Sequence, residues 1–372
     1  MKIPSTPESR LVIHVGPRKT ATTYLQQNFF RATSELEQKG WIYPVISNRV
    51  RNAHHEVASV RKFNGSQKIP VMKRLKAAAT RARAAHCGLL LSSEGFSRWK
   101  GRDLAALARH LGYSSVTIVW MLRDPVSILA SVWSEAVKNG ASTSLPEFVA
   151  KHMADPTRSS LVNPVIELKP LFKTDGIDLR VLNYEAIRES GADVFSEFCR
   201  IILGLDDMKP ERVTEANTRR PVEFTEFLRM LAPSVKRSRE NFGVMFGRAV
   251  ERRLTDRQID AIVSDIAARK DTAGRIVTVS RDEPWYRQME SRLVEMLGDR
   301  LQPPARDGRI FPSGTLSLAC YDRDALEADA AIAAHARKVA GKMRAGVINR
   351  LWTKARLRLL SMRRGFGRLF RR

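Results

Sequence analysis

The stretch from Leu11 to Leu25, LVIHVGPRKTATTYL, most constrains how this chain can fold. Its apolar, β-branched start predicts a buried strand, which ends at the turn-forming pair Gly16-Pro17. Basic and hydroxyl residues follow, and a helix is expected from about residue 22. The first N–H groups of a helix have no partners within it, so a loop of this kind predicts a binding site for a phosphate or sulfate.

The spacing of this loop differs from that of nucleoside-triphosphate loops. Those loops have the pattern G-x-x-x-x-G-K-[ST]. Here Lys19 follows Gly16 by only three residues, and a Thr-Ala-Thr-Thr run comes after it. An ordinary strand-to-helix turn with a solvated lysine is the alternative interpretation of the same residues.

The run instead resembles the 5′-phosphosulfate loop of sulfotransferases that use 3′-phosphoadenosine 5′-phosphosulfate (PAPS), whose usual form is close to P-K-[ST]-G-T-T-x-L. Ala21 stands where that family usually has Gly, so the loop needs a conformation that a non-Gly residue tolerates. The resemblance implies that Lys19 assists the leaving group. It also implies that the loop binds the phosphosulfate through Arg18, Lys19, Thr20, Ala21, Thr22 and Thr23.

A second stretch follows the strand predicted over 116–122. Asp124 is a good N-cap and Pro125 a good first helical residue, so a helix is expected to begin at once, with Ser127 and Ser131 one turn apart. Arg123 and Ser131 resemble the family's 3′-phosphate element, R-[ND]-P-x-x-x-x-x-S. A guanidinium fork and a hydroxyl suit a phosphate monoester. The alternative is a structural ion pair at Arg123.

The strand predicted over 179–183 precedes Tyr184, in the run Tyr-Glu-Ala-Ile. Sulfotransferases often have Tyr-Glu-Asp-Leu there, with the tyrosine near the adenine, and an aromatic ring can stack on a purine. The resemblance therefore implies that Tyr184 belongs to the nucleotide site. The alternative is a tyrosine at the edge of the core.

The catalytic base is expected just after the strand predicted over 88–91. Glu94 stands there, where cytosolic sulfotransferases have a histidine as base; sulfotransferases that modify carbohydrate use Glu. Its alternatives are a helix cap or a pair with Arg98. His54 and His55 are further candidates, because histidine is readily used as a base near neutral pH, and their alternative is a surface pair.

Charge and cysteine content limit the class of protein. The net charge is +25, which favours anionic partners, and three widely spaced cysteines argue against a disulfide framework and against a zinc site. No signal peptide and no membrane span are expected, so the chain is predicted to be cytoplasmic.

The tail over 331–372 has thirteen Lys and Arg and no acidic residue. Its apolar stripe favours docking on an anionic membrane, with packing on the protein body or disorder as alternatives.

These motifs together resemble a bacterial PAPS-dependent sulfotransferase over residues 10 to 205. The resemblance implies an α/β fold, with a central parallel sheet of the P-loop nucleotide-binding type and a mainly helical C-terminal part. We expect a catalytic domain over 1–300, a connecting segment over 301–330 and the basic tail. The expected acceptor is a hydroxyl on a saccharide or glycolipid, and no metal is expected. The alternatives are a P-loop kinase for a small hydroxyl or sugar and a non-enzymatic, basic membrane- or nucleic-acid-binding protein.

Overall fold

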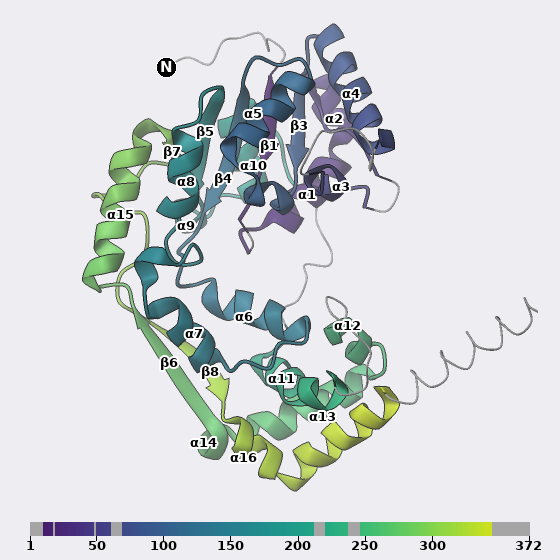
Figure 1. Cartoon of the computed structure of the whole chain (residues 1–372), viewed down its shortest axis with the longest axis vertical. Coiled ribbons are helices and arrows are strands. Elements are labelled where there is room, and N and C mark those ends of the chain that lie inside the picture. The colour runs from purple at the N-terminus through teal and green to yellow at the C-terminus, as the bar shows by residue number, and fades with distance from the viewer. Residues whose placement is uncertain are drawn as a thin grey trace, which may run out of the picture. The chain divides into compact units, whose positions relative to one another are not determined.

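A computed structural model describes residues 10–17, 19–47, 50–60, 69–211, 220–236 and 246–343. These residues divide into two compact units that alternate along the chain (Figure 1). The first is drawn from Met1–Leu129, His152–Thr218 and Ser280–Leu316, and the second from the remaining stretches. The predicted catalytic domain over 1–300, connecting segment over 301–330 and tail over 331–372 stay predictions.

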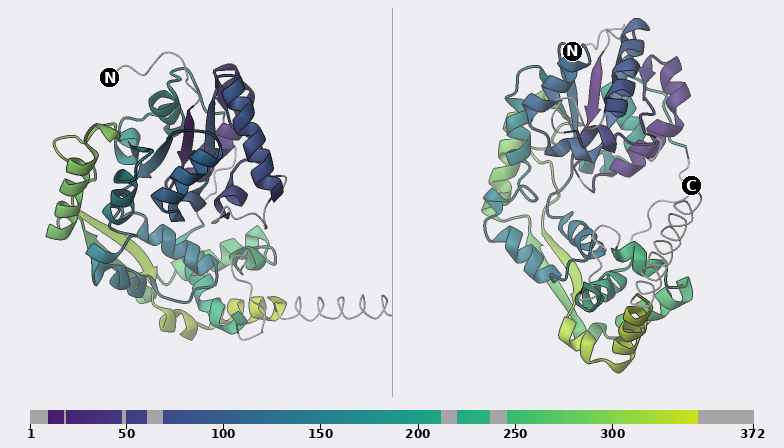
Figure 2. Two further views of the ribbon diagram at one scale, coloured as in Figure 1. Left: turned by 45° about the horizontal axis from the view of Figure 1, so that its top comes forward. Right: turned by 45° about the vertical axis from the view of Figure 1, so that its right-hand side comes forward.

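The first unit is built on a parallel sheet of six strands in the order β2-β3-β1-β4-β5-β7. Its strands are β1 Leu11–His14, β2 Trp41–Ile42, β3 Gly88–Ser92, β4 Val116–Leu122, β5 Ile177–Asn183 and β7 Leu301–Gln302. The purple strand β1 lies inside this sheet (Figure 2). The predicted α/β class with a central parallel sheet is therefore confirmed. All six strands point the same way, so their carboxyl ends meet at one edge.

Helices cover both faces of the sheet, so its inner strands are buried on both sides. Figure 1 shows α5 and α8 on one side of the strands and α10 on the other. The helices of this unit are α1 Thr22–Arg31, α2 Thr33–Gln38, α3 His55–Ala58, α4 Ile69–Ala84, α5 Gly101–His110, α8 Val165–Phe172, α9 Tyr184–Glu189, α10 Val194–Phe198 and α15 Pro284–Leu297. Shorter turns are η1 Glu94–Arg98, η2 Pro156–Arg158, η3 Cys199–Leu203 and η5 Gly298–Arg300.

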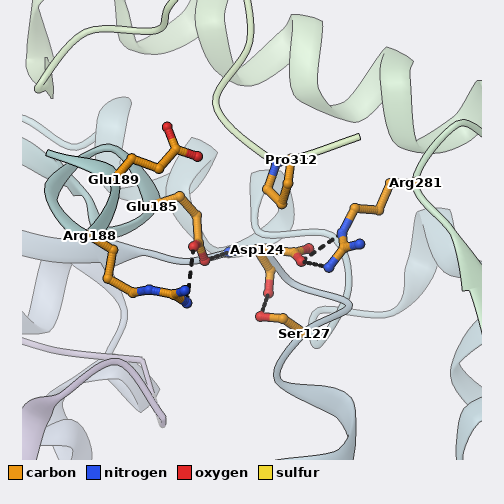
Figure 3. Close-up of a pocket in the computed structure, with 7 residues that line it drawn as sticks. All are labelled: Asp124, Ser127, Glu185, Arg188, Glu189, Arg281 and Pro312. Atoms are coloured by element: carbon orange, nitrogen blue, oxygen red, sulfur yellow. Dashed lines mark hydrogen bonds and ion pairs between the residues drawn. The ribbon is translucent and has the colours of Figure 1, made fainter. Parts of the chain in front are cut away.

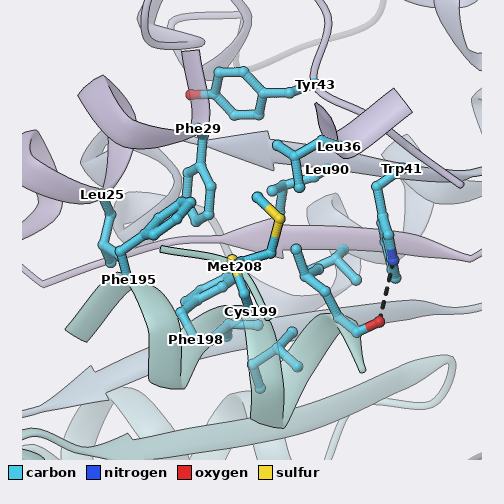
Figure 4. Packing of buried hydrophobic residues seen from close by; sticks show 14 of the residues in the cluster. Leu25, Phe29, Leu36, Trp41, Tyr43, Leu90, Phe195, Phe198, Cys199 and Met208 are labelled. Carbon is cyan, nitrogen blue, oxygen red and sulfur yellow. Dashed lines mark hydrogen bonds between the residues drawn. The ribbon is translucent and has the colours of Figure 1, made fainter. Parts of the chain in front are cut away.

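One apolar cluster joins α1, α2 and α10 to the sheet (Figure 4). Phe29 lies at its centre, with ring centroids 5.5 Å from Phe195 and 4.9 Å from Phe198. Trp41 Nε1 donates to the Leu203 carbonyl at 3.1 Å, so its one polar atom is satisfied inside the cluster. This packing fixes the start of α1 relative to the carboxyl end of β1.

The second unit is mainly helical. Its elements are α6 Leu129–Lys138, α7 Leu145–Met153, α11 Val222–Lys236, α12 Phe246–Glu251, α13 Asp256–Ala267, α14 Lys270–Ala273, α16 Arg323–Ala328 and the paired strands β6 Gly274–Ser280 and β8 Thr315–Tyr321. Residues 330–343 are helical too, and Ile332, Val339 and Met343 there are buried. The rest of the predicted basic tail lies outside the described residues. Within them, no helix has both the length and the apolar character needed to span a membrane.

Candidate functional site

The loop between β1 and α1 has a backbone conformation suited to binding an anion. Gly16, Lys19 and Ala21 have positive φ angles of 60°, 69° and 59°. A Cβ at Gly16 would meet Thr22 Oγ1 at 2.8 Å, so only glycine fits there. Ala21 is the N-cap of α1 and provides no side-chain cap, so the first N–H groups of that helix are not capped by a side chain. Successive N–H groups in alternating conformations form concave anion sites.

The threonines of this loop differ in their surroundings. The buried Thr20 hydroxyl donates its one proton to the Pro17 carbonyl at 2.6 Å, and Thr22 Oγ1 lies 3.4 Å from the same oxygen. Thr20 therefore braces the loop from inside, whereas Thr23 is exposed at the start of α1. Arg18, the remaining predicted loop residue, lies outside the described residues.

Arg123 links the loop to the carboxyl ends of β4 and β5. Its Nη1 donates to the Lys19 carbonyl at 2.6 Å, and its guanidinium carbon lies 5.1 Å from the centroid of the Tyr184 ring. Its Nε is 4.0 Å from Glu185 Oε1. Three residues predicted from separate motifs, Lys19, Arg123 and Tyr184, are thus brought together. Ser131, the predicted partner of Arg123, is on α6 in the second unit, so that pairing stays a prediction.

The prediction that a helix begins directly after Arg123 is wrong. Residues 125–128 form turns, and α6 begins only at Leu129, so Ser127 and Ser131 do not share a helix. The Asp124 carboxylate does accept from the Val126 N–H, at 3.1 Å. Ser127 Oγ donates to the Asp124 carbonyl at 2.7 Å, which closes the turn. Asp124 therefore closes a turn and is not the N-cap of a helix, and Pro125 is not a first helical residue.

Asp124 is held by residues that sequence reasoning missed. Arg281 Nε and Nη2 donate to Asp124 Oδ2 at 2.9 and 2.7 Å, and the Tyr286 hydroxyl donates to Oδ1 at 2.7 Å. All three side chains are buried. Burial, together with the Asp124 carboxylate, raises the pKa of Tyr286. The only sequence signal was the helix start near Trp285-Tyr286, which does not reveal its partner about 160 residues upstream.

A pocket of about 270 Å³ opens beside Asp124 (Figure 3). Its lining carries both signs of charge, in two ion pairs. Arg188 Nη1 lies 3.8 Å from Glu185 Oε2, and Arg281 is paired with Asp124. The other lining residues are Ser127, Glu189 and Pro312. Glu185 Oε1 also accepts from the Asp124 N–H at 3.1 Å, so this carboxylate ties the ends of β4 and β5 together.

His54 is a buried backbone brace at the end of β3. Its Nε2 lies 2.9 Å from the Pro44 carbonyl, to which it donates, and its Nδ1 accepts from the Ser92 N–H at 2.9 Å. Burial lowers its pKa to about 4. Both ring nitrogens are engaged by the backbone, which leaves neither for a substrate. His14, which the sequence analysis did not single out, is also buried, pairs with Ser92 Oγ at 2.9 Å, and has a pKa lowered by burial to about 3.

Glu94 and His55 lie on neighbouring elements beyond β3. Glu94 is half-buried and opens η1, and within the described chain its carboxylate makes no hydrogen bond or ion pair, including with Arg98. His55 is half-buried at the start of α3, with Nδ1 2.8 Å from Ser93 Oγ. A Cβ at Gly95 would lie 2.9 Å from that of Ala58, so α3 and η1 pack closely.

Comparison with known proteins gives no neighbour: no protein-family model, no curated protein and no solved structure matches the chain. Among the residues that the structure describes, no three His, Cys, Asp or Glu side chains form a group that could hold a metal ion.

Proposed function

We propose that this chain is a PAPS-dependent sulfotransferase that transfers a sulfuryl group to an acceptor hydroxyl, on a saccharide or glycolipid. The observation that carries the proposal is the loop from Gly16 to Ala21. Its three positive φ angles lie between a buried strand and a helix start without a side-chain cap, at the carboxyl edge of a parallel sheet. Ligands of open α/β sheets bind at this edge.

The loop suits a phosphosulfate because its backbone N–H groups and the positive end of the α1 dipole favour an anion. PAPS, when bound, supplies the sulfuryl group. In our proposal Lys19 donates to the oxygen that leaves, and Glu94 accepts the proton of the acceptor hydroxyl. Transfer of this kind has a loose transition state by analogy with phosphoryl transfer, so the protein mainly positions groups and stabilises charge.

Arg123 is proposed to bind the 3′-phosphate. A guanidinium has five N–H donors in a fork, and one of them already holds the Lys19 carbonyl. The same side chain therefore couples the proposed 3′-phosphate site to the proposed 5′-phosphosulfate loop. The ring face of Tyr184 stacks against the Arg123 guanidinium.

The kinase alternative finds less support at this edge. A kinase site needs an acidic residue to hold Mg²⁺, and Asp124 is the carboxylate that follows β4. Both of its oxygens are occupied by Arg281 and Tyr286.

The third class, a non-enzymatic basic protein, is supported only by the net charge of +25. That charge is also the basis for proposing a cytoplasmic enzyme that works at an anionic membrane face.

The test is calorimetric titration of the full chain with 3′-phosphoadenosine 5′-phosphate, and separately with ATP plus Mg²⁺. We expect metal-independent binding of the bisphosphate. Arg123→Ala should weaken it about 10- to 100-fold, since hydrogen bonds to charged groups contribute about 1.5–3 kcal/mol. Arg102→Ala is the matched control, because Arg102 is an exposed side chain on α5. Binding of ATP with Mg²⁺ alone would favour the kinase, and no nucleotide binding would favour the basic binding protein.

Lys19→Ala tests the leaving-group role. If Lys19 stabilises developing charge, sulfuryl transfer from PAPS should fall about 10²- to 10³-fold in kcat. Lys76→Ala, which removes an exposed lysine from α4, should leave kcat unchanged. Equal effects in the two variants would remove Lys19 from the mechanism.

A further inference from the structure

The hydrogen bonds of Ser93 determine which nitrogen of His55 carries a proton. Ser93 is fully buried, and its Oγ accepts from the Gly95 N–H at 3.1 Å as the N-cap of η1. Its own O–H still needs an acceptor, because buried polar groups are almost always hydrogen-bonded. In the described part of the chain the acceptor within reach is His55 Nδ1, at 2.8 Å.

A ring nitrogen that accepts a hydrogen bond carries no proton. With the Ser93 hydroxyl donating to Nδ1, the neutral His55 ring holds its proton on Nε2. His55 therefore presents a hydrogen-bond donor, and in this state it has no free lone pair with which to act as a base. Glu94, the residue next to Ser93, presents the opposite group: a carboxylate without a partner in the described chain.

The two groups are held in one rigid piece. Trp99 Nε1 donates to the Ala58 carbonyl at 2.8 Å, which ties the end of η1 to the end of α3. Phe96 packs edge-on against Trp99 with ring centroids 5.4 Å apart. The glycine at 95 permits the close approach of the two elements. The two elements that carry His55 and Glu94 are thus packed against each other within the fold.

We infer that Ser93 is a positioning residue that fixes His55 as an Nε2–H donor beside Glu94, and that this pair selects a hydroxyl as the acceptor group. A hydroxyl can accept from His55 Nε2–H and donate its proton to Glu94 at the same time, which leaves a second lone pair for attack. An amine that is protonated at neutral pH has no lone pair for His55. The role of His55 and Glu94 toward the acceptor rests on the proposed sulfotransfer. The tautomer of the His55 ring does not depend on that proposal.

The tautomer is tested first, by NMR of the full chain with ¹⁵N-labelled histidine rings. The chain has seven histidines, and the His55 signals are identified by their loss in His55→Gln. We expect the Nε2–H form at neutral pH in the wild type and a mixture of both forms in Ser93→Ala. His54 is the internal control, because its backbone partners fix the Nε2–H form in both proteins. An Nδ1–H form of His55 in the wild type would overturn the inference.

Kinetics with PAPS and a hydroxyl acceptor test the division of roles. Loss of one neutral hydrogen bond should raise the acceptor KM of His55→Ala about 2- to 10-fold with little change in kcat. His55→Gln, whose amide can donate, should recover part of this loss. Glu94→Gln should instead lower kcat about 10²- to 10⁴-fold, as for removal of a general base. A collapse of kcat in His55→Ala with full activity in Glu94→Gln would overturn the inference. If the chain binds no bisphosphate, the proposed function has failed, and the NMR result alone decides the inference.

Discussion

The loop after β1 and the turn after β4 end neighbouring strands of one sheet, yet they use their polar groups in opposite ways. After β4, the Asp124 carboxylate is saturated by Arg281, Tyr286 and the Val126 N–H, all inside the fold. After β1, three residues have positive φ angles, and the N-cap of α1 is an alanine, whose methyl side chain cannot cap the helix. One strand end thus uses its polar groups to stabilise the fold, whereas the other leaves the first N–H groups of α1 without a side-chain cap.

The end of β3 combines both kinds of behaviour within a few residues. His54 satisfies Ser92 and Pro44 with both ring nitrogens, as a structural group does. Glu94, two residues after Ser92, has no partner in the described chain. Four substitutions therefore test the comparison between closed and open strand ends.

Asp124→Ala should cause the largest loss of stability. It leaves the buried Arg281 guanidinium and the Tyr286 hydroxyl without their partner, and breaking a buried ion pair costs about 3–5 kcal/mol. Urea unfolding of the full chain measures the free energy. Glu327→Ala is the control, because it removes the exposed Arg323–Glu327 pair and should cost less than about 1 kcal/mol. Similar losses in the two variants would contradict a closed end at β4.

The buried histidines should make stability depend on pH. The pKa of His54 is lowered to about 4 by burial, whereas an unfolded histidine titrates near 6.5. Below about pH 6.5, His54 is therefore protonated in the unfolded chain but stays neutral in the folded chain. The free energy of unfolding consequently falls as the pH drops toward 4. For His54 alone the loss between pH 7 and 5 is about 2 kcal/mol.

Urea unfolding at pH 7 and at pH 5 measures this slope. His54→Asn should be less stable at pH 7 but should lose less on acidification than the wild type. His110→Gln, at the exposed end of α5, should keep the wild-type slope. An unchanged slope in His54→Asn would show that His54 is not the group that titrates.

The smallest effects are expected in the loop, and they should have opposite signs. Gly16→Ala places a Cβ 2.8 Å from Thr22 Oγ1 at a φ of 60°, so it should cost about 1–2 kcal/mol and weaken bisphosphate binding. Ala21→Gly relieves the strain of a positive φ of 59°, but glycine also gives the unfolded chain more entropy, which opposes this gain. The net result should be an increase of up to about 1 kcal/mol in the free energy of unfolding. Thermal unfolding measures the stability of both variants, and calorimetry measures their binding of the bisphosphate. A loss of stability in Ala21→Gly would contradict the left-handed backbone conformation of Ala21.

Much of the fold was readable from local patterns. The predicted strands at 116–122 and 179–183 appear as β4 and β5, and the helix expected from about residue 22 appears as α1. The loop was also identified as the place where the chain passes from β1 to α1. Hydrophobic periodicity and turn residues act over a few neighbours, so they determine such elements without the rest of the chain.

Local sequence patterns were sufficient to predict the parallel α/β class and the motifs that bring Lys19, Arg123 and Tyr184 to one edge of the sheet. The use of each group depends on residues that only the folded chain brings together. Arg281 and Tyr286 occupy Asp124 from about 160 residues away, His54 turns inward to the backbone, and Ser93 fixes the proton of His55. These outcomes depend on which distant donor or acceptor reaches a buried group, and no local pattern carries that information.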